Sequence, residues 1–389
     1  MSYWRMPWNR NIGPIGLDLG AEAPRLMQVR HGIDAPRQVA VVRCEPGDGL
    51  VQRAVAAAHA MRKGRFVGRE VVVGLPSSFA RMHVARLPVI AGADAREAVA
   101  WEAAERNGMA RESIVADAIP TGAPAPHGDA KEEQLVVAAP ADELEQALGV
   151  LVDAGFDPVA VEPRFMAIAR AMSRRARRDA DATNVRAVLH VEQHGSCIMV
   201  LRGDRIAFCR EIPVGGETLD HAVASRLSVP IEAAAALRAH RIAAVRGMAP
   251  AVDAVAEESA LAATRATIDA LAGEVALCLR YYGVTFRGGQ PGRVVVSGPH
   301  GAEPRLAEIV AETTRAEVVP FDRELPSAAA EGGEVRLGAG EFASWLAAYG
   351  LACRGRHDEA HAHGHGGSRG AKQGMHQHAP HAAQGRAAA

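Results

Sequence analysis

The fold of this chain is decided by the stretch Ile15-Gly16-Leu17-Asp18-Leu19-Gly20-Ala21-Glu22-Ala23-Pro24. The apolar residues around Asp18 predict a buried strand, and Gly20 and Pro24 after it predict a tight hairpin turn. A strand with an aspartate and a glycine at its end is common, so the meaning of this stretch depends on the segments that follow it.

Composition places the chain among globular proteins with room for two domains. It has 389 residues, of which 48% are hydrophobic and 23% charged, as is typical of soluble globular proteins. The formal net charge of −1 and the 4% of aromatic residues argue against nucleic-acid binding and against electrostatic attachment to a membrane. No apolar stretch approaches the roughly 18 residues that would span a bilayer.

The cysteines and histidines indicate no metal centre. The five cysteines are scattered without a CxxC pair, so we expect reduced, buried thiols rather than a zinc site or disulfides. Residues 354–389 are rich in Gly, Ala and His. This composition cannot bury a core, so we expect a disordered tail that holds metal weakly at most. No catalytic residue is singled out.

Hydrophobic periodicity divides the chain into two larger domains, an insertion and two ends. We expect an N-terminal arm at 1–11, a first domain formed by 12–76, 163–184 and 336–353, an inserted α+β subdomain at 77–162, a second domain at 185–335, and the tail at 354–389. Within the insertion the pattern predicts a strand, a helix, two strands, a helix and a last strand at 159–161. The basic run 174–178 is typical of a solvated helix end.

Several phrases occur in an order that resembles the PilM family of type IV pilus assembly proteins, a branch of the actin-like ATPase superfamily. They are Val73-Gly74-Leu75-Pro76 followed by Arg86-Leu87-Pro88, the helix Arg96-Glu97-Ala98-Val99-Ala100-Trp101-Glu102-Ala103, Ala154-Gly155-Phe156-Asp157-Pro158 followed by Val161-Glu162-Pro163, and Arg210-Glu211-Ile212-Pro213-Val214-Gly215-Gly216. The resemblance covers residues 12–352. It implies an α/β, actin-like (ribonuclease H-like) two-domain fold with an inserted α+β subdomain.

The resemblance also implies where ATP and Mg²⁺ would bind. In the superfamily, two glycine-rich hairpins that each carry an acidic residue hold the phosphates and the metal, while a helix and a glycine-ended strand hold the adenosine. The matching residues here are Asp18, Gly20, Gly215, Gly216, Arg238 and Gly298. Glycine admits the phosphate, carboxylate binds the metal, and a basic side chain supplies positive charge.

This chain departs from the family pattern in all four pieces of that site. After Gly20, the usual hydroxyl positions hold Ala21, Glu22 and Ala23. Pro24 removes a backbone donor, and Arg25 stands where lysine is usual. In the second hairpin, His190 and Glu192 occupy the expected aspartate and glycine positions. Ala235 and Arg238 replace the glutamate and lysine of the helix, and Pro299 replaces one of the strand's two glycines. These changes together predict a vestigial nucleotide site.

The family resemblance further implies a scaffold at the inner face of the inner membrane. Such a protein binds the cytoplasmic N-terminal peptide of a PilN-like membrane protein and joins other pilus assembly proteins, and its membrane association is peripheral, through that partner. The peptide groove lies beside the insertion, where we expect Leu87 and Trp101 as wall residues.

Three other interpretations stay open. They are an active ATP-binding regulator of the same machinery, a relative of FtsA or GspL, and, as the weakest, a small-molecule kinase on this fold. The tail lacks the amphipathic helix that FtsA uses at membranes. The sequence leaves the oligomeric state undecided.

Overall fold

The computed structural model describes residues 11–20, 23–31, 37–44, 47–90, 92–121, 131–173, 184–285, 289–321 and 342–354. The predictions for the N-terminal arm, for Glu22, for the basic run at 174–178 and for the histidine-rich tail lie outside these residues. Among the helices in the described ranges, none combines the length and the apolar composition that a membrane crossing requires.

The first half of the fold is built on a five-stranded sheet in the order β3-β2-β1-β4-β8. Its strands are β1 (Ile12–Asp18), β2 (Arg25–Arg30), β3 (Arg37–Arg43), β4 (Glu70–Leu75) and β8 (Asp157–Pro163). The first three strands pair antiparallel, whereas β4 runs parallel to both β1 and β8. The first four residues of the stretch 15–24 therefore lie in the central strand β1, and the others lie between β1 and β2.

The second half repeats this topology in a sheet ordered β11-β10-β9-β12-β13. Its strands are β9 (Val185–Val191), β10 (Ser196–Arg202), β11 (Arg205–Ile212), β12 (Arg293–Ser297) and β13 (Glu317–Pro320). Again the first three strands are antiparallel and the last two join in parallel. β1 and β9 thus hold equivalent central positions, and the turns that follow them are the two hairpins identified from the sequence.

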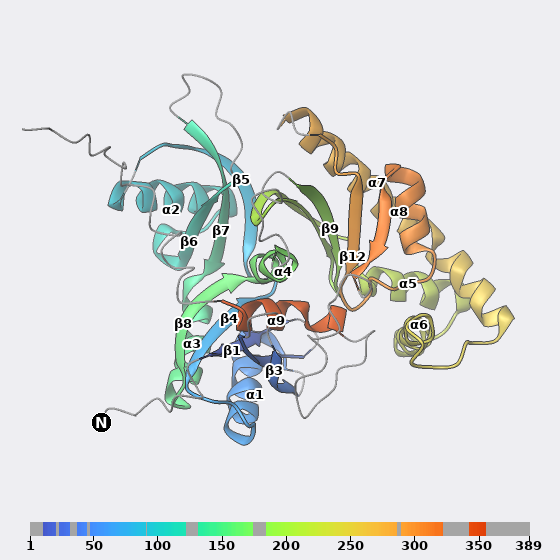
Figure 1. The fold of residues 1–389 in the computed structure, drawn as a ribbon, viewed down its shortest axis with the longest axis horizontal. Coiled ribbons are helices and arrows are strands. Elements are labelled where there is room, and N and C mark those ends of the chain that lie inside the picture. The colour runs from blue at the N-terminus through green and yellow to red at the C-terminus, as the bar shows by residue number, and fades with distance from the viewer. Residues whose placement is uncertain are drawn as a thin grey trace, which may run out of the picture. The chain divides into compact units, whose positions relative to one another are not determined.

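Helices cover both sheets (Figure 1). The first half carries α1 (Gly49–Lys63), α3 (Ala141–Asp153), α4 (Arg164–Ser173) and α9 (Leu346–Ala352), which follows a 3-10 turn at Phe342–Trp345. The second half carries α5 (Gly216–Leu227), α6 (Ile231–Val245), α7 (Ala254–Thr285) and α8 (Leu306–Thr314). The apolar face of α7 is buried from Ile268 to Tyr282, whereas Leu261 is half-buried.

Glycine allows two close approaches of backbone around α9. A Cβ on Gly16 of β1 would lie 2.5 Å from the backbone nitrogen of Ala352, and a Cβ on Gly350 would overlap the backbone of Ala167 in α4. Real Cβ atoms do not approach so closely, so larger residues would push these elements apart. Helix α9 is thereby packed between β1 and α4. Helix α4 begins with Arg164, the charged residue at the centre of the site described below.

The insertion is smaller than the sequence predicted. Its sheet has the order β5-β7-β6, formed by β5 (Arg81–Pro88), β6 (Ile114–Pro120) and β7 (Lys131–Pro140), and α2 (Ala93–Asn107) packs on it. The helix and strand predicted to end the insertion belong to the first half instead, because α3 packs on α1 and β8 pairs with β4. Pattern reading places each element along the chain, but strand pairing decides to which sheet it belongs.

Candidate functional site

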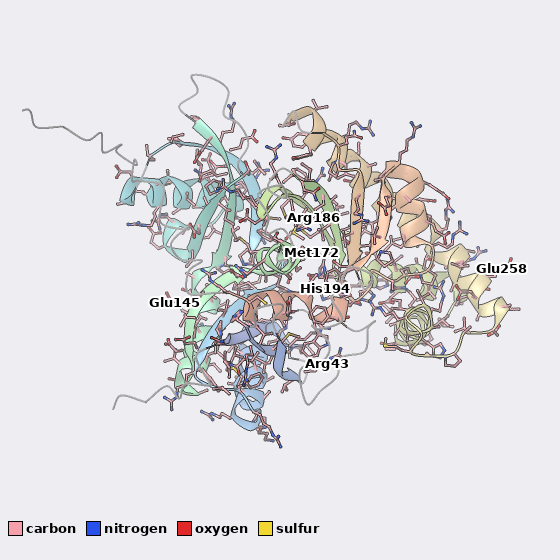
Figure 2. The ribbon with its side chains drawn as sticks, viewed as in Figure 1. Arg43, Glu145, Met172, Arg186, His194 and Glu258 are labelled. Atoms are coloured by element: carbon pink, nitrogen blue, oxygen red, sulfur yellow. The ribbon has the colours of Figure 1, made fainter. Side chains whose placement is uncertain are left out.

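The candidate site lies at the ends of β1 and β9, where the two equivalent hairpins meet the N-terminus of α4. Figure 2 labels His194 in the second hairpin, and it labels Met172 and Arg186 close together above it. The guanidinium of Arg186, in β9, donates to the carbonyl of Met172, in α4, at 2.7 Å. Helix α4 is therefore bound to the second sheet while it packs against the first.

Arg164, the first residue of α4, joins the two hairpins. Its Nε and Nη2 atoms lie 2.7 and 3.1 Å from the carboxylate oxygens of Asp18, and its Nη1 atom donates to Glu192. The side chains of Asp18, Arg164 and Glu192 are 0%, 4% and 16% exposed. A cation at a helix N-terminus is disfavoured by the helix dipole, so the two carboxylates supply the charge that keeps this guanidinium buried.

The electrostatics of Glu192 reflect this contact. Burial alone would raise the pKa of its carboxyl, but Arg164, His190 and Arg25 together lower the pKa to about 2. The imidazole of His190 lies with Nε2 at 3.3 Å from Glu192 and with Nδ1 at 2.9 Å from the hydroxyl of Ser297. A continuous polar chain therefore runs from β1 through α4 to β9 and β12.

The predicted phosphate glycines pack against protein atoms. A Cβ on Gly20 would lie 3.4 Å from Cζ of Arg164, and Gly298 turns with φ of 97° against the backbone of Val191. Gly215 lies against the second hairpin. The next two amides, those of Gly216 and residue 217, donate to carbonyls of that hairpin, each at 2.8 Å. The first amides of α5 are thus already bonded to backbone.

Arg238, predicted to face the adenosine, is buried in a second network. Its guanidinium donates to Asp220 at 2.5 Å, to Glu303 at 2.8 and 3.1 Å, and to the carbonyl of Gly216 at 2.7 Å. One turn later in α6, Arg241 binds Glu303 at 3.0 Å and Glu257 at 2.8 and 2.9 Å. These pairs connect α5, α6, α7 and the segment after β12.

In this conformation the described residues do not fit a nucleotide with its metal. Asp18 and Glu192, the acidic side chains at the two hairpins, both bind Arg164, and Arg238 is 1% exposed among carboxylates. His300 also packs close to Gly216, since a Cβ there would lie 2.5 Å from its Nε2 atom. Within the ranges that the structure covers, no group of three or more His, Cys, Asp or Glu side chains is arranged to hold a metal ion.

The structure therefore brings the predicted nucleotide residues together, but around contacts that the sequence did not suggest. Sequence reasoning missed Arg164. Its signal is an arginine directly after Pro163, at the end of a buried strand and the start of a helix. Such a cation needs carboxylate partners.

The two residues predicted to bind a partner differ in exposure. Leu87 is 6% exposed and belongs to the core of the insertion with Val99 and Ala103. We therefore assign Leu87 to that core and not to a partner surface, because alternation along β5 turns it towards α2. Trp101 is 61% exposed on α2. A large exposed aromatic is typical of interaction surfaces.

Comparison with known proteins decides the family. The model of the family "Type IV pilus assembly protein PilM" matches residues 51–356. The chain belongs to the PilM family. No curated protein sequence matches it.

The solved structures that are similar to this chain include a PilM chain, which supports the fold. A type IV pilus biogenesis complex of PilM with PilN is 20% identical, with a TM-score of 0.69, over 88% of this chain and 98% of the solved one. The ethanolamine utilization protein EutJ of Carboxydothermus hydrogenoformans is 14% identical, with a TM-score of 0.48, over 88% of this chain and 90% of the solved one. The cytoplasmic domain of EpsL, from the type II secretion system of Vibrio cholerae, is 15% identical, with a TM-score of 0.36, over 56% of this chain and 76% of the solved one. The predicted family and fold class are both confirmed.

Proposed function

We propose that this protein is a scaffold of type IV pilus assembly that binds the cytoplasmic N-terminal peptide of a PilN-like inner-membrane protein without using a nucleotide. The family match supports a role in pilus assembly, and the similar solved chain is in complex with PilN. Through that partner the protein would work at the inner face of the inner membrane.

The position of Arg164 is the observation that supports peptide binding without a nucleotide. A nucleotide with Mg²⁺ would have to displace this guanidinium from both Asp18 and Glu192. Removing one partner from a buried ion pair costs about 3–5 kcal/mol. The charge that Arg164 now supplies to the two carboxylates would then have to come from the incoming Mg²⁺ alone. A vestigial site whose charges are satisfied within the protein accounts for this arrangement better than a resting ATPase does.

The insertion supports the binding role. It has its own sheet and core, so its outer surface is held in a defined shape. Exposed apolar side chains occur along the insertion, at Val89 and Ile90 after β5, at Trp101 on α2 and at Val115 on β6. An extended apolar peptide that docks beside this subdomain would cover such side chains.

Calorimetry tests both parts of the proposal. ATP with Mg²⁺ should give no binding heat at millimolar concentration, while an actin-like ATPase with an intact site serves as the positive control. A synthetic peptide with the cytoplasmic N-terminal sequence of the organism's PilN-like protein should bind equally with and without ATP, and its scrambled version should not bind. Magnesium-dependent ATP binding would instead establish the alternative, an ATP-binding regulator.

A further pair of variants examines the predicted contact. Trp101→Ala should weaken peptide binding about tenfold or more, as the loss of a large aromatic at an interface does. Tyr281→Ala is the matched control, because Tyr281 is also exposed but lies on α7, outside the insertion. Equal peptide affinities of the two variants would remove Trp101 from the partner surface.

A further inference from the structure

A cavity of about 230 Å³ lies where the first half, the insertion and the second half meet. Its walls are the segment Pro76–Ser78 between β4 and β5, the hairpin Glu192–Cys197, and Glu211–Pro213 at the end of β11. The polar side chains that line it are those of Ser77, Ser78, Glu192, His194, Ser196 and Glu211. The hairpin Glu192–Cys197 is the one that the resemblance assigned to the phosphates, whereas Ser77, Ser78 and Glu211 lie outside the residues so assigned.

The charges around this cavity leave one carboxylate without a cation. Glu192 binds Arg164, and His194 lies 2.8 Å from Glu217 on α5. Glu211 contacts the hydroxyl of Ser77. Its neighbour Arg210 points to Glu274 on α7, at 3.4 Å. Among the described residues, no Lys, Arg or His forms an ion pair with Glu211.

The titration of Glu211 fits this environment. Burial raises the pKa of its carboxyl to about 7, the negative charge of Glu192 adds to the increase, and the hydrogen bond from Ser77 opposes it. The neighbouring Cys197 stays a neutral thiol, since its contact with Cys209 and its burial raise its pKa further. A cation that enters the cavity would stabilise the ionised form of Glu211 and so lower the pKa of its carboxyl.

We propose that this cavity receives a Lys or Arg side chain from the cytoplasmic segment of the membrane partner, with Glu211 as its carboxylate partner and Ser77 and Ser78 as hydrogen-bond acceptors. The inference rests on the proposed function. Cytoplasmic segments next to a membrane span carry an excess of Lys and Arg, which complements a cavity with one unpaired carboxylate. The cavity is also large enough for a single basic head group, but not for a folded element.

Binding of a cation to Glu211 has a measurable signature. The bound side chain stabilises the ionised carboxylate, so the complex releases a proton near neutral pH. With a carboxyl pKa of about 7 in the free protein, the affinity should rise about tenfold between pH 6 and pH 8. His240 is an exposed histidine of α6 outside the cavity lining, so the variant His240→Gln should keep this pH dependence.

The experiment measures binding of the PilN-like peptide to the full chain by calorimetry at pH 6 and pH 8. Glu211→Gln should lower the affinity about tenfold at pH 8 and abolish the pH dependence. The variant replaces a half-buried carboxyl by a neutral group of similar shape and should fold, as circular dichroism will show. Glu258→Gln, a change at an exposed glutamate of α7 labelled in Figure 2, is the control of equal charge.

Peptide variants assign the contact to a side chain. Replacing the peptide's Lys and Arg residues one at a time by Gln should identify one position whose loss is not additive with Glu211→Gln. The inference is overturned if wild type and Glu211→Gln bind the native peptide equally, or if acetylation of the peptide's amino terminus alone removes the effect. If the peptide does not bind the wild-type protein, the proposed function falls and this inference falls with it.

Discussion

Replacing Arg164 by methionine should destabilise the protein strongly at neutral pH. Methionine keeps most of the volume and the helical preference of the side chain, so the change chiefly removes the charge. Two carboxylates, those of Asp18 and Glu192, then lose the cation that binds both. Asp18 is completely buried and has no access to water.

The magnitude follows from the burial of the pair. Loss of one partner of a buried ion pair costs about 3–5 kcal/mol, and the partial exposure of Glu192 places the expected value near the lower end. The sign of the pH effect is also defined. The pKa of Glu192 is lowered from 4.5 to about 2. Its contribution to stability is therefore complete above pH 4.5 and is lost as the pH falls towards 2.

Urea unfolding of the wild type and of Arg164→Met, followed by tryptophan fluorescence, measures this loss. Trp345 is buried in the core and should report the transition. The deficit of the variant should be largest at pH 7.5 and should shrink at pH 4.5, because burial favours the protonated form of Glu192 once its cation is gone. Arg265→Met, which breaks a pair between half-exposed side chains on α7, is the control and should leave the unfolding midpoint unchanged.

Two outcomes would refute the reasoning. An Arg164→Met protein within about 1 kcal/mol of wild type at pH 7.5 would mean that the ion cluster is not a buried pair in the sense used here. A large deficit that is the same at pH 7.5 and pH 4.5 would assign the loss to packing. Adding Glu192→Gln to the variant should recover part of the stability, since a buried charge is then replaced by a neutral group of similar shape.

Three other changes have defined outcomes. Gly350→Ala should cost about 3 kcal/mol or more in urea unfolding because its Cβ overlaps the backbone of α4, whereas Gly273→Ala, at an open helical position, should gain up to about 1 kcal/mol. The wild type should lose about 2–3 kcal/mol of stability as the pH rises from 4.5 through 7, because the pKa of Glu211 is raised to about 7; Glu211→Gln should not show that loss, and parallel pH profiles would contradict the assignment. Iodoacetamide should label the native protein slowly, since all five cysteines are buried and the pKa of Cys197 is raised well above normal; rapid labelling of Cys197 before unfolding would contradict this.

Local pattern was sufficient to predict most of the elements. The apolar run Val294-Val295-Val296 became β12, and the stripe from Ile268 to Tyr282 became the buried face of α7. These segments have a strong period or a fully apolar run, and their local preference agrees with their tertiary surroundings. The order of such segments resembles that of the PilM family, and this resemblance implied the two-domain architecture.

Sheet membership could not be predicted from the same signals. β8 follows α3 in the chain just as a last strand of the insertion would, yet it pairs with β4 across the whole inserted segment. Exposure along β5 was equally ambiguous, because either alternating face of a strand can be the buried one until its packing partner is known. Leu87 consequently proved to be core.

The contacts of the site were beyond sequence reasoning for a related cause. Asp18, Arg164 and Glu192 come from three separate segments, and each is common when considered alone. Only the fold shows that one guanidinium lies between the two equivalent hairpins. The sequence indicated that all four pieces of the nucleotide site depart from the family pattern, and two of the departing residues, Glu192 and Arg238, form ion pairs within the protein.

The packing of α9 on β1 affects how the protein must fold during its synthesis. β1 leaves the ribosome long before α9, the helix that covers it. Until that helix emerges, the nascent chain exposes one face of its first sheet, and such long-range closure is slow and prone to aggregation. A chain that stops before Leu346 would leave that face open, so truncation at this end should yield a chaperone-dependent product even though β1 and its hairpin are intact.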